Sequence, residues 1–395
     1  MTRTAIAALA AAALLPAMAG AQEASAKPSF EVYGFAMVDW IQDFNRVDPT
    51  WDSTLRPTRI PVTKGQFGSN GQAIFSARQS RLGARGSLPA GKFDVKGRVE
   101  FDFYGRGTDR PDAAGQSTIR LRRAYGEWGP LLGGLTDSLF MDDDYWPNII
   151  DYWGPSGMVF YRNVQIRLTM PGLPAPHSFA VALERPGSDL QAYPNELPDL
   201  VSDNKLPDLT GRYRITTAGG YVQVSGILRR LGYDSAGTPN NEPKGSKVGW
   251  GGNISSTLKI LPDKLNLLLA AAGGKGIANY MNDATPDLAA GGSADAPKPE
   301  AVPLLGLSGY ADVVWNEMFT SSFGFSMVRL WNTSLQPARA MKIGQYASAN
   351  VLVHPAQNVL FGPEFLWGRR EDKDGADGHD YRLQISVKYA FSSKS

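Results

Sequence analysis

The sequence predicts an all-β protein: a transmembrane, antiparallel, up-and-down β-barrel of 16 strands with long extracellular loops and short periplasmic turns. Three observations lead to this prediction. Apolar and polar residues alternate with a period of two through most of the chain, long and short connections alternate between these segments, and the N-terminus has the pattern of an export signal. Such a barrel is a single domain, although a length of 395 residues would suggest two or three soluble domains.

The composition excludes several classes of protein. The chain contains no cysteine, so it has no disulfide framework, thiol nucleophile or cysteine metal site. It has three histidines (His177, His354 and His379), which argues against a multi-histidine metal centre. The formal net charge of +2 provides no overall field to hold nucleic acid. We therefore expect no cofactor, no bound metal and no nucleic-acid partner.

Residues 1–21 have the organisation of a secretory signal peptide. Arg3 supplies the positive charge, Ala5 to Leu15 form an apolar run of 11 residues, and Ala19-Gly20-Ala21 matches a cleavage site. The run is too short to span a bilayer, although a short N-terminal anchor helix is an alternative. No later segment has 18 consecutive apolar residues. We expect residues 22–395 to form one barrel domain in the outer membrane of a Gram-negative bacterium.

The segment 92–105 shows the strand pattern most clearly, with an apolar face from Phe93 to Phe103 and a charged face from Asp94 to Asp102. The same alternation predicts 16 strands, most of them 9 to 14 residues long, as tilted membrane strands need to be. In chain order they are 30–43, 73–86, 92–105, 117–128, 131–140, 159–170, 177–185, 208–217, 220–231, 247–260, 264–275, 305–316, 319–330, 341–353, 358–371 and 379–391. The segments 117–128, 131–140 and 341–353 have mixed polarity.

The connections support a membrane barrel over a soluble sandwich. Those after odd-numbered strands are long: 44–72, 106–116, 141–158, 186–207, 232–246, 276–304, 331–340 and 372–378. Those after even-numbered strands are short and rich in turn residues, such as Pro89-Ala90-Gly91. Outer-membrane barrels alternate in this way, with the long loops outside. Aromatic residues cluster near the strand ends, as interfacial girdles require, although aromatic packing in a soluble core is an alternative: Trp40, Trp128, Tyr213, Trp250, Trp315, Trp331, Trp367, Tyr389 and Phe391.

A barrel of 16 strands encloses a water-filled lumen, which predicts passive diffusion of small hydrophilic solutes. The 141–158 connection is acidic and aromatic, and its rings need a surface to pack on, so we expect it to fold inward as a constriction. Its candidate constriction residues are Asp142, Asp143, Asp144, Tyr145, Trp146 and Asp151. Basic residues on the expected lumen face are Lys96, Arg98, Arg120, Arg122, Arg167, Arg212 and Arg214. Because guanidinium groups bind carboxylates bidentately, this wall predicts a preference for small anions such as dicarboxylates. The alternative is that the charges only pair with one another, in a non-selective channel.

Several short segments between 78 and 170 resemble the DcaP-like family of outer-membrane porins. They include Arg81-Leu82-Gly83, Glu100 to Gly105, the block from Arg120 to Gly129, and Ile150 to Pro155. Weaker similarity continues into the C-terminal strand. The resemblance implies a homotrimer of 16-stranded barrels that takes up small carboxylate solutes and contacts outer-membrane lipid and lipopolysaccharide. Some members carry an N-terminal coiled coil, for which Gln22 to Ser29 leave no room here.

Other interpretations have less support. The segment 372–380 has the alternating carboxylates of a calcium loop but lacks the distal glutamate, so a solvated hairpin turn is the better prediction. The 282–303 segment is predicted to be a mobile external loop. An outer-membrane hydrolase would need a histidine beside a serine, and none of the three histidines is placed for this. A periplasmic β-sandwich binding protein is a further alternative, which cell fractionation would distinguish.

Overall fold

The computed structural model describes residues 27–105, 118–191, 200–293 and 295–394. The predicted signal peptide, 1–21, lies outside these residues. Within them, no helix combines the length and the apolar character needed to cross a membrane.

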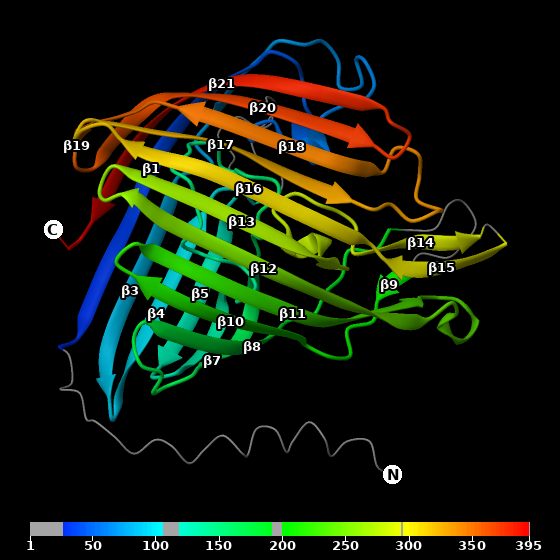
Figure 1. Ribbon diagram of the computed structural model, residues 1–395, viewed down its shortest axis with the longest axis horizontal. Coiled ribbons are helices and arrows are strands. Elements are labelled where there is room, and N and C mark those ends of the chain that lie inside the picture. Colours follow the sequence, from blue (N-terminus) through cyan, green and yellow to red (C-terminus); the bar gives the residue numbers. More distant parts are fainter. Residues whose placement is uncertain (1–26, 106–117, 192–199, 294, 395) are drawn as a thin grey trace.

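Sixteen strands form one closed antiparallel barrel (Figure 1). The first eight are β1 (Ser29–Asp43), β3 (Arg81–Ala90), β4 (Phe93–Asp102), β5 (Arg120–Trp128), β6 (Leu131–Asp137), β7 (Arg162–Thr169), β8 (His177–Glu184) and β10 (Asp208–Thr217). The last eight are β11 (Gly220–Ser235), β12 (Gly245–Leu261), β13 (Leu265–Lys275), β16 (Pro303–Val314), β17 (Phe319–Leu330), β18 (Met341–Asn350), β20 (Val359–Asp372) and β21 (Asp377–Ser392). β21 pairs with β1 from Tyr33↔Ser392 to Asp43↔Arg382, which closes the sheet. The predicted fold class is confirmed.

Two of the predicted strands, 73–86 and 341–353, are each split in two. β2 (Gln72–Ser76) pairs with the second half of β1, while β3 pairs with its first half. Between Ser76 and Arg81 the chain takes five steps along four steps of β1, so it bulges out of the ladder. The bulge turns Gln79 inward, where its amide donates to Ile150 O at 2.7 Å. β19 (Leu352–Ala356) continues β18 toward the turn before β20.

The two faces of the sheet differ as the alternation predicts. Large apolar side chains on the outer face are exposed, for example Ile166, Val224 and Ile254. Polar side chains on the inner face are buried against the loops inside the barrel, for example Asp39, Gln384 and Ser386. A sheet with its apolar side chains outside and its polar ones inside is stable only when a nonpolar medium surrounds it.

The long connections gather at one end of the barrel, opposite the C-terminus (Figure 1). The connection expected over 372–378 is an exception, because β20 and β21 extend until only residues 373–376 join them. The expected mobile loop over 282–303 contains a β-hairpin, β14 (Leu288–Ser293) and β15 (Ala296–Ala301). Its small apolar residues Leu288, Ala289 and Ala290 are buried, so they pack where an open loop was expected. A short strand, β9 (Leu200–Ser202), pairs with the end of β11 beyond the barrel.

Candidate pore constriction

The connection between β6 and β7, residues 138–161, runs inside the barrel and is called the inward loop below. β6 was predicted to reach residue 140 but ends at Asp137, because the next side chains turn inward. Leu139 packs against Ala180 and Ala182 of β8, and Phe140 joins a core cluster that includes Tyr280. These apolar contacts carry the loop away from the wall, since exposing them in a water-filled lumen would be unfavourable.

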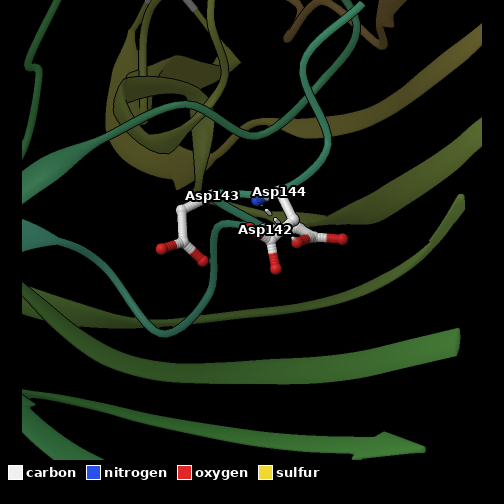
Figure 2. A group of neighbouring side chains, drawn as sticks. All are labelled: Asp142, Asp143 and Asp144. Carbon is white, nitrogen blue, oxygen red and sulfur yellow. Dashed lines mark hydrogen bonds between the residues drawn. The ribbon is translucent and has the colours of Figure 1, made fainter. Parts of the chain in front are cut away.

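The acidic start of the inward loop consists of Asp142, Asp143 and Asp144 (Figure 2). Asp142 is buried and accepts hydrogen bonds from Tyr221 OH at 2.8 Å and Ser255 Oγ at 2.6 Å. Within the described residues these three aspartates are the one acidic or histidine cluster whose ligand atoms are close enough to hold a metal ion. Arginines of β10 already face this cluster, which argues for a charge-paired segment.

Arg212 and Arg214 of β10 lie against the acidic cluster. Arg214 forms an ion pair with Asp144 at 2.7 Å and stacks its guanidinium 3.6 Å from the Tyr221 ring centre. Arg212 lies 3.9 Å from Asp143, whose side chain is 49% exposed. Partial desolvation of this half-exposed side chain by the surrounding barrel, followed by the negative charge of neighbouring aspartates, raises the pKa of the Asp143 carboxyl above its usual value. These two arginines therefore offset the acidic charge of the loop.

The middle of the inward loop is fixed by packing. Tyr145 is buried, and its hydroxyl donates to Ser308 Oγ of β16 at 2.8 Å. Trp146 is partly buried and its ring centre lies 5.3 Å from that of Phe160. Tyr145 thus ties the loop to β16, and the contact between Trp146 and Phe160 joins two parts of the loop to each other.

Asp151 lies in a buried polar clamp between the inward loop and the wall. Its carboxylate accepts hydrogen bonds from Leu55 N, Gly154 N and Tyr346 OH at 3.1–3.2 Å. Glu364 of β20 accepts the backbone N–H of Ile150 at 3.0 Å and of Asp151 at 2.9 Å. Asp151 is 2% exposed, so its role in this geometry is to fix the loop.

The inner face of β3 to β7 carries an arginine wall, and Asp143 of the acidic segment lines a cavity with three of its arginines. Its members are Arg81, Arg98, Arg120, Arg122, Arg123, Arg162 and Arg167. The carboxylates that they contact are Glu100, Asp102 and Asp137. Five of the seven guanidinium groups thus share three carboxylates. Arg162 forms no ion pair within the described residues, and Arg167 hydrogen-bonds only neutral groups, the Gln165 side chain and the Asp137 carbonyl. The wall carries an excess of positive charge.

Tyr152 connects the inward loop to the arginine wall. Its hydroxyl accepts hydrogen bonds from Arg120 and Arg122 and donates to Asp102 at 2.9 Å. Its ring stacks on Tyr104 with centres 3.9 Å apart. The loop is therefore anchored to both sides of the barrel, by Tyr152 on the arginine wall and by Asp142 on β11 and β12.

Two wall arginines have buried donors without a protein partner among the described residues. These are Nε of Arg81 and Nη1 of Arg162. Arg81 and Tyr152 line a cavity of about 220 Å³ together with Arg122, Arg123, Gln79, Met141, Asp143, Trp146, Ile149, Asp151 and Phe160. A buried N–H without a partner costs free energy, so these donors favour a bound water or anion.

The structure divides the predicted basic residues into three groups. Arg98, Arg120, Arg122 and Arg167 belong to the arginine wall, whereas Arg212 and Arg214 pair with the acidic loop. Lys96 is exposed further along β4, in a second cavity with Arg85, Arg98 and Lys394 at the short-turn end of the barrel. Sequence reasoning missed Arg81, Arg123 and Arg162 as site residues.

The histidines and the 372–380 segment have other partners. His177 hydrogen-bonds Tyr213 OH at 2.7 Å, and His354 hydrogen-bonds Thr320 Oγ1 at 3.0 Å. Asp372 and Asp374 form ion pairs with Arg370 and Arg339, and Asp377 pairs with Arg369. The carboxylates of this segment are therefore paired with arginines in a charged hairpin turn.

Comparisons with known proteins agree with this architecture. A family model described as DcaP outer membrane protein matches residues 21–391. The outer membrane channel DcaP of Acinetobacter baumannii has a similar structure, with a TM-score of 0.79 and 21% identity, covering 94% of this chain and 100% of that chain. An anion-selective porin from Comamonas acidovorans has a TM-score of 0.59 and 9% identity, and the match covers 92% of this chain and 100% of that porin. OmpF of Salmonella typhi, solved with daunomycin, has a TM-score of 0.55 and 10% identity, covering 92% and 97%. No curated protein matches the sequence.

Proposed function

The chain belongs to the DcaP outer membrane protein family, and on that premise we propose that it is a passive channel favouring small anions, dicarboxylates in particular. The excess of guanidinium groups on the arginine wall carries this proposal. Arg81 lines the small cavity with a buried donor that has no protein partner, as a carboxylate-binding position requires, and Arg162 holds a second such donor on the same wall. The proposed function is transport, and no residue is assigned a catalytic role.

The charge balance at the inward loop supports anions over cations. Asp142 and Asp144 would attract cations if they faced the lumen alone. Arg214 lies within 4 Å of both, and Arg212 lies 3.9 Å from Asp143, so the acidic side is largely compensated. The arginine wall keeps its excess of positive charge. A passing anion is therefore attracted more strongly than a cation at the narrow part of the lumen.

The experiment is a bilayer recording of the reconstituted channel under a salt gradient. An anion-selective reversal potential that moves further when a dicarboxylate replaces chloride supports the proposal. A reversal potential near zero would support the alternative, a non-selective general porin. A cation-selective potential would overturn the anion preference.

The proposed mature protein is a single barrel, 22–395, released from a signal peptide at 1–21, with its inward loop as the constriction. We further propose a homotrimer in contact with lipopolysaccharide. β5 and β6 support an intersubunit position for that side of the barrel, because they are short, at nine and seven residues. A Vibrio cholerae outer membrane protein of similar fold, with a TM-score of 0.52, is described in a trimer form. Chemical crosslinking in native membranes tests this assembly.

A further inference from the structure

Two cations stand on the outer face of the barrel, where a membrane protein normally has apolar residues. Lys275 is the last residue of β13 and Arg329 is the penultimate residue of β17, and both are exposed. Both point outward by the alternation of their strands, in line with Leu269 and Phe325, which are exposed apolar residues. A positive charge on the lipid side costs about 2–4 kcal/mol at the bilayer midplane and about 0–1 kcal/mol near the interface. These residues therefore mark the interfacial level.

The pair lies at the end of the barrel that carries the long connections. β13 continues into the long 276–302 connection, and β17 continues into 331–340. β16 lies between the two strands in the sheet, with Lys275 beside Pro303 and Arg329 beside Leu305 (Figure 1). Strand spacing then separates the two α-carbons by roughly 12 Å. With the long connections outside, both cations face the outer leaflet.

Neither cation has an acidic partner within the described residues. The other outward cations of this rim do: Arg230 pairs with Asp203 at 3.1 Å, and Arg369 pairs with Asp377 at 3.2 Å. Arg329 lies over the Trp331 ring at 5.3 Å, and Trp250 stands beside Lys275 in the ladder. Both tryptophans are exposed, at 44% and 51%. Two unpaired cations between two interfacial tryptophans form a patch suited to an anionic headgroup.

We propose that Lys275 and Arg329, with Trp250 and Trp331, bind the phosphate groups of a lipopolysaccharide molecule in the outer leaflet. Charge complementarity selects the occupant, since the surrounding leaflet presents phosphorylated glycolipid at this level. The patch is also opposite β5 and β6 around the barrel, so it stays in contact with lipid when that side faces another subunit. The inference depends on the membrane orientation and not on anion selectivity.

The test is the affinity of the detergent-solubilised full-length protein for fluorescently labelled lipopolysaccharide. The double variant Lys275→Gln with Arg329→Gln removes the patch charges. Each basic residue near an anionic surface is worth about a fivefold change in affinity, so we expect roughly 30-fold weaker binding. Lys259→Gln with Lys264→Gln is the matched control, because it removes two cations from the short-turn end of the β12–β13 hairpin. We expect this control to bind as the parent does.

Four results would overturn the inference. Three of them are equal affinity in the patch variant, an equal loss in the control, and undiminished binding of dephosphorylated lipopolysaccharide. If phosphatidylglycerol bound as tightly, with the same dependence on the patch, the patch would bind anionic headgroups in general and the assignment to lipopolysaccharide would fail. Heat-modifiable migration on gels verifies that each variant is folded. The reversal potential of the patch variant should equal that of the parent, so a failure here is distinct from a failure of the proposed anion preference.

Discussion

Removing the guanidinium of Arg162 should weaken anion selectivity without disturbing the fold. Arg162 begins β7, and its guanidinium lies 5.0 Å from the Phe160 ring centre. It forms no ion pair within the described residues, so Arg162→Gln leaves no carboxylate unpaired. By contrast, Arg123 pairs with both Glu100 and Asp137, and its removal would leave buried negative charge behind. Arg162 is thus the residue of the arginine wall whose charge can be removed with the least effect on the fold.

The magnitude follows from the charges of the arginine wall. Seven arginines and three carboxylates leave four excess positive charges, and Arg162→Gln leaves three. One unit charge at 4 Å in water contributes about 1 kcal/mol, or roughly fivefold in the local concentration of a monovalent anion. The same charge repels a cation equally, so the anion-to-cation permeability ratio should fall by about 5-fold to 30-fold.

The assay is the reversal potential of single channels in a potassium chloride gradient at low ionic strength. At about 0.1 M salt the screening length is about 10 Å, so a wall charge still acts across a narrow pore. Arg369→Gln is the control, because it removes one cation from the outer rim, where Asp377 and Glu371 are its partners. An unchanged reversal potential in Arg162→Gln, or an equal shift in Arg369→Gln, would refute the assignment of selectivity to the arginine wall.

Three further outcomes follow from the inward loop. Glu364→Leu leaves two buried backbone N–H groups unpaired and should destabilise the loop by about 2–6 kcal/mol, seen as noisier single-channel currents and a lower unfolding temperature, whereas Glu364→Gln should cost less because it keeps one acceptor. The raised pKa of Asp143 means that the folded protein binds its proton at a higher pH than the unfolded chain does. As the pH falls through that pKa, protonation removes a negative charge from the lumen, so anion conductance should increase. The folded protein should become more stable over the same pH range, because the ionised Asp143 is less favourable in the folded state than in the unfolded chain. Asp143→Asn should abolish both pH dependences. Tyr152→Phe should keep the ring stacking but lose the contacts with Arg120, Arg122 and Asp102, lowering the unfolding temperature by an amount equivalent to about 1–3 kcal/mol.

The alternation of the sequence predicts the barrel because each strand carries its own evidence of which side faces lipid. It places Arg98, Arg120 and Arg122 correctly on the inner face. Strict alternation from Arg122 would put its neighbour Arg123 on the lipid side, whereas Arg123 pairs with Glu100 and Asp137 on the inner face. A bulge shifts the register so that Glu100 pairs with Arg123 while Phe101 pairs with Leu121. The extra residue turns both Arg122 and Arg123 inward. A bulge depends on the local balance of ladder bonds and side-chain contacts, which alternation does not express.

The sequence also could not predict which residues of the barrel wall the acidic loop contacts. The pattern gives the face of each strand but not which part of the wall the inward loop meets. The sequence therefore predicts one set of seven basic residues facing the acidic loop and does not say which of them the aspartates contact. In the structure Asp142 and Asp144 lie against Arg214, while Tyr152, ten residues after Asp142, reaches the arginine wall. The loop thus contacts β10 through its negatively charged aspartates and contacts the arginine wall through the neutral hydroxyl of Tyr152. Because Asp142 and Asp144 pair with Arg214 on β10, they do not neutralise the arginine wall, whose seven arginines exceed its three carboxylates. The same loop that narrows the lumen therefore leaves it favourable to anions.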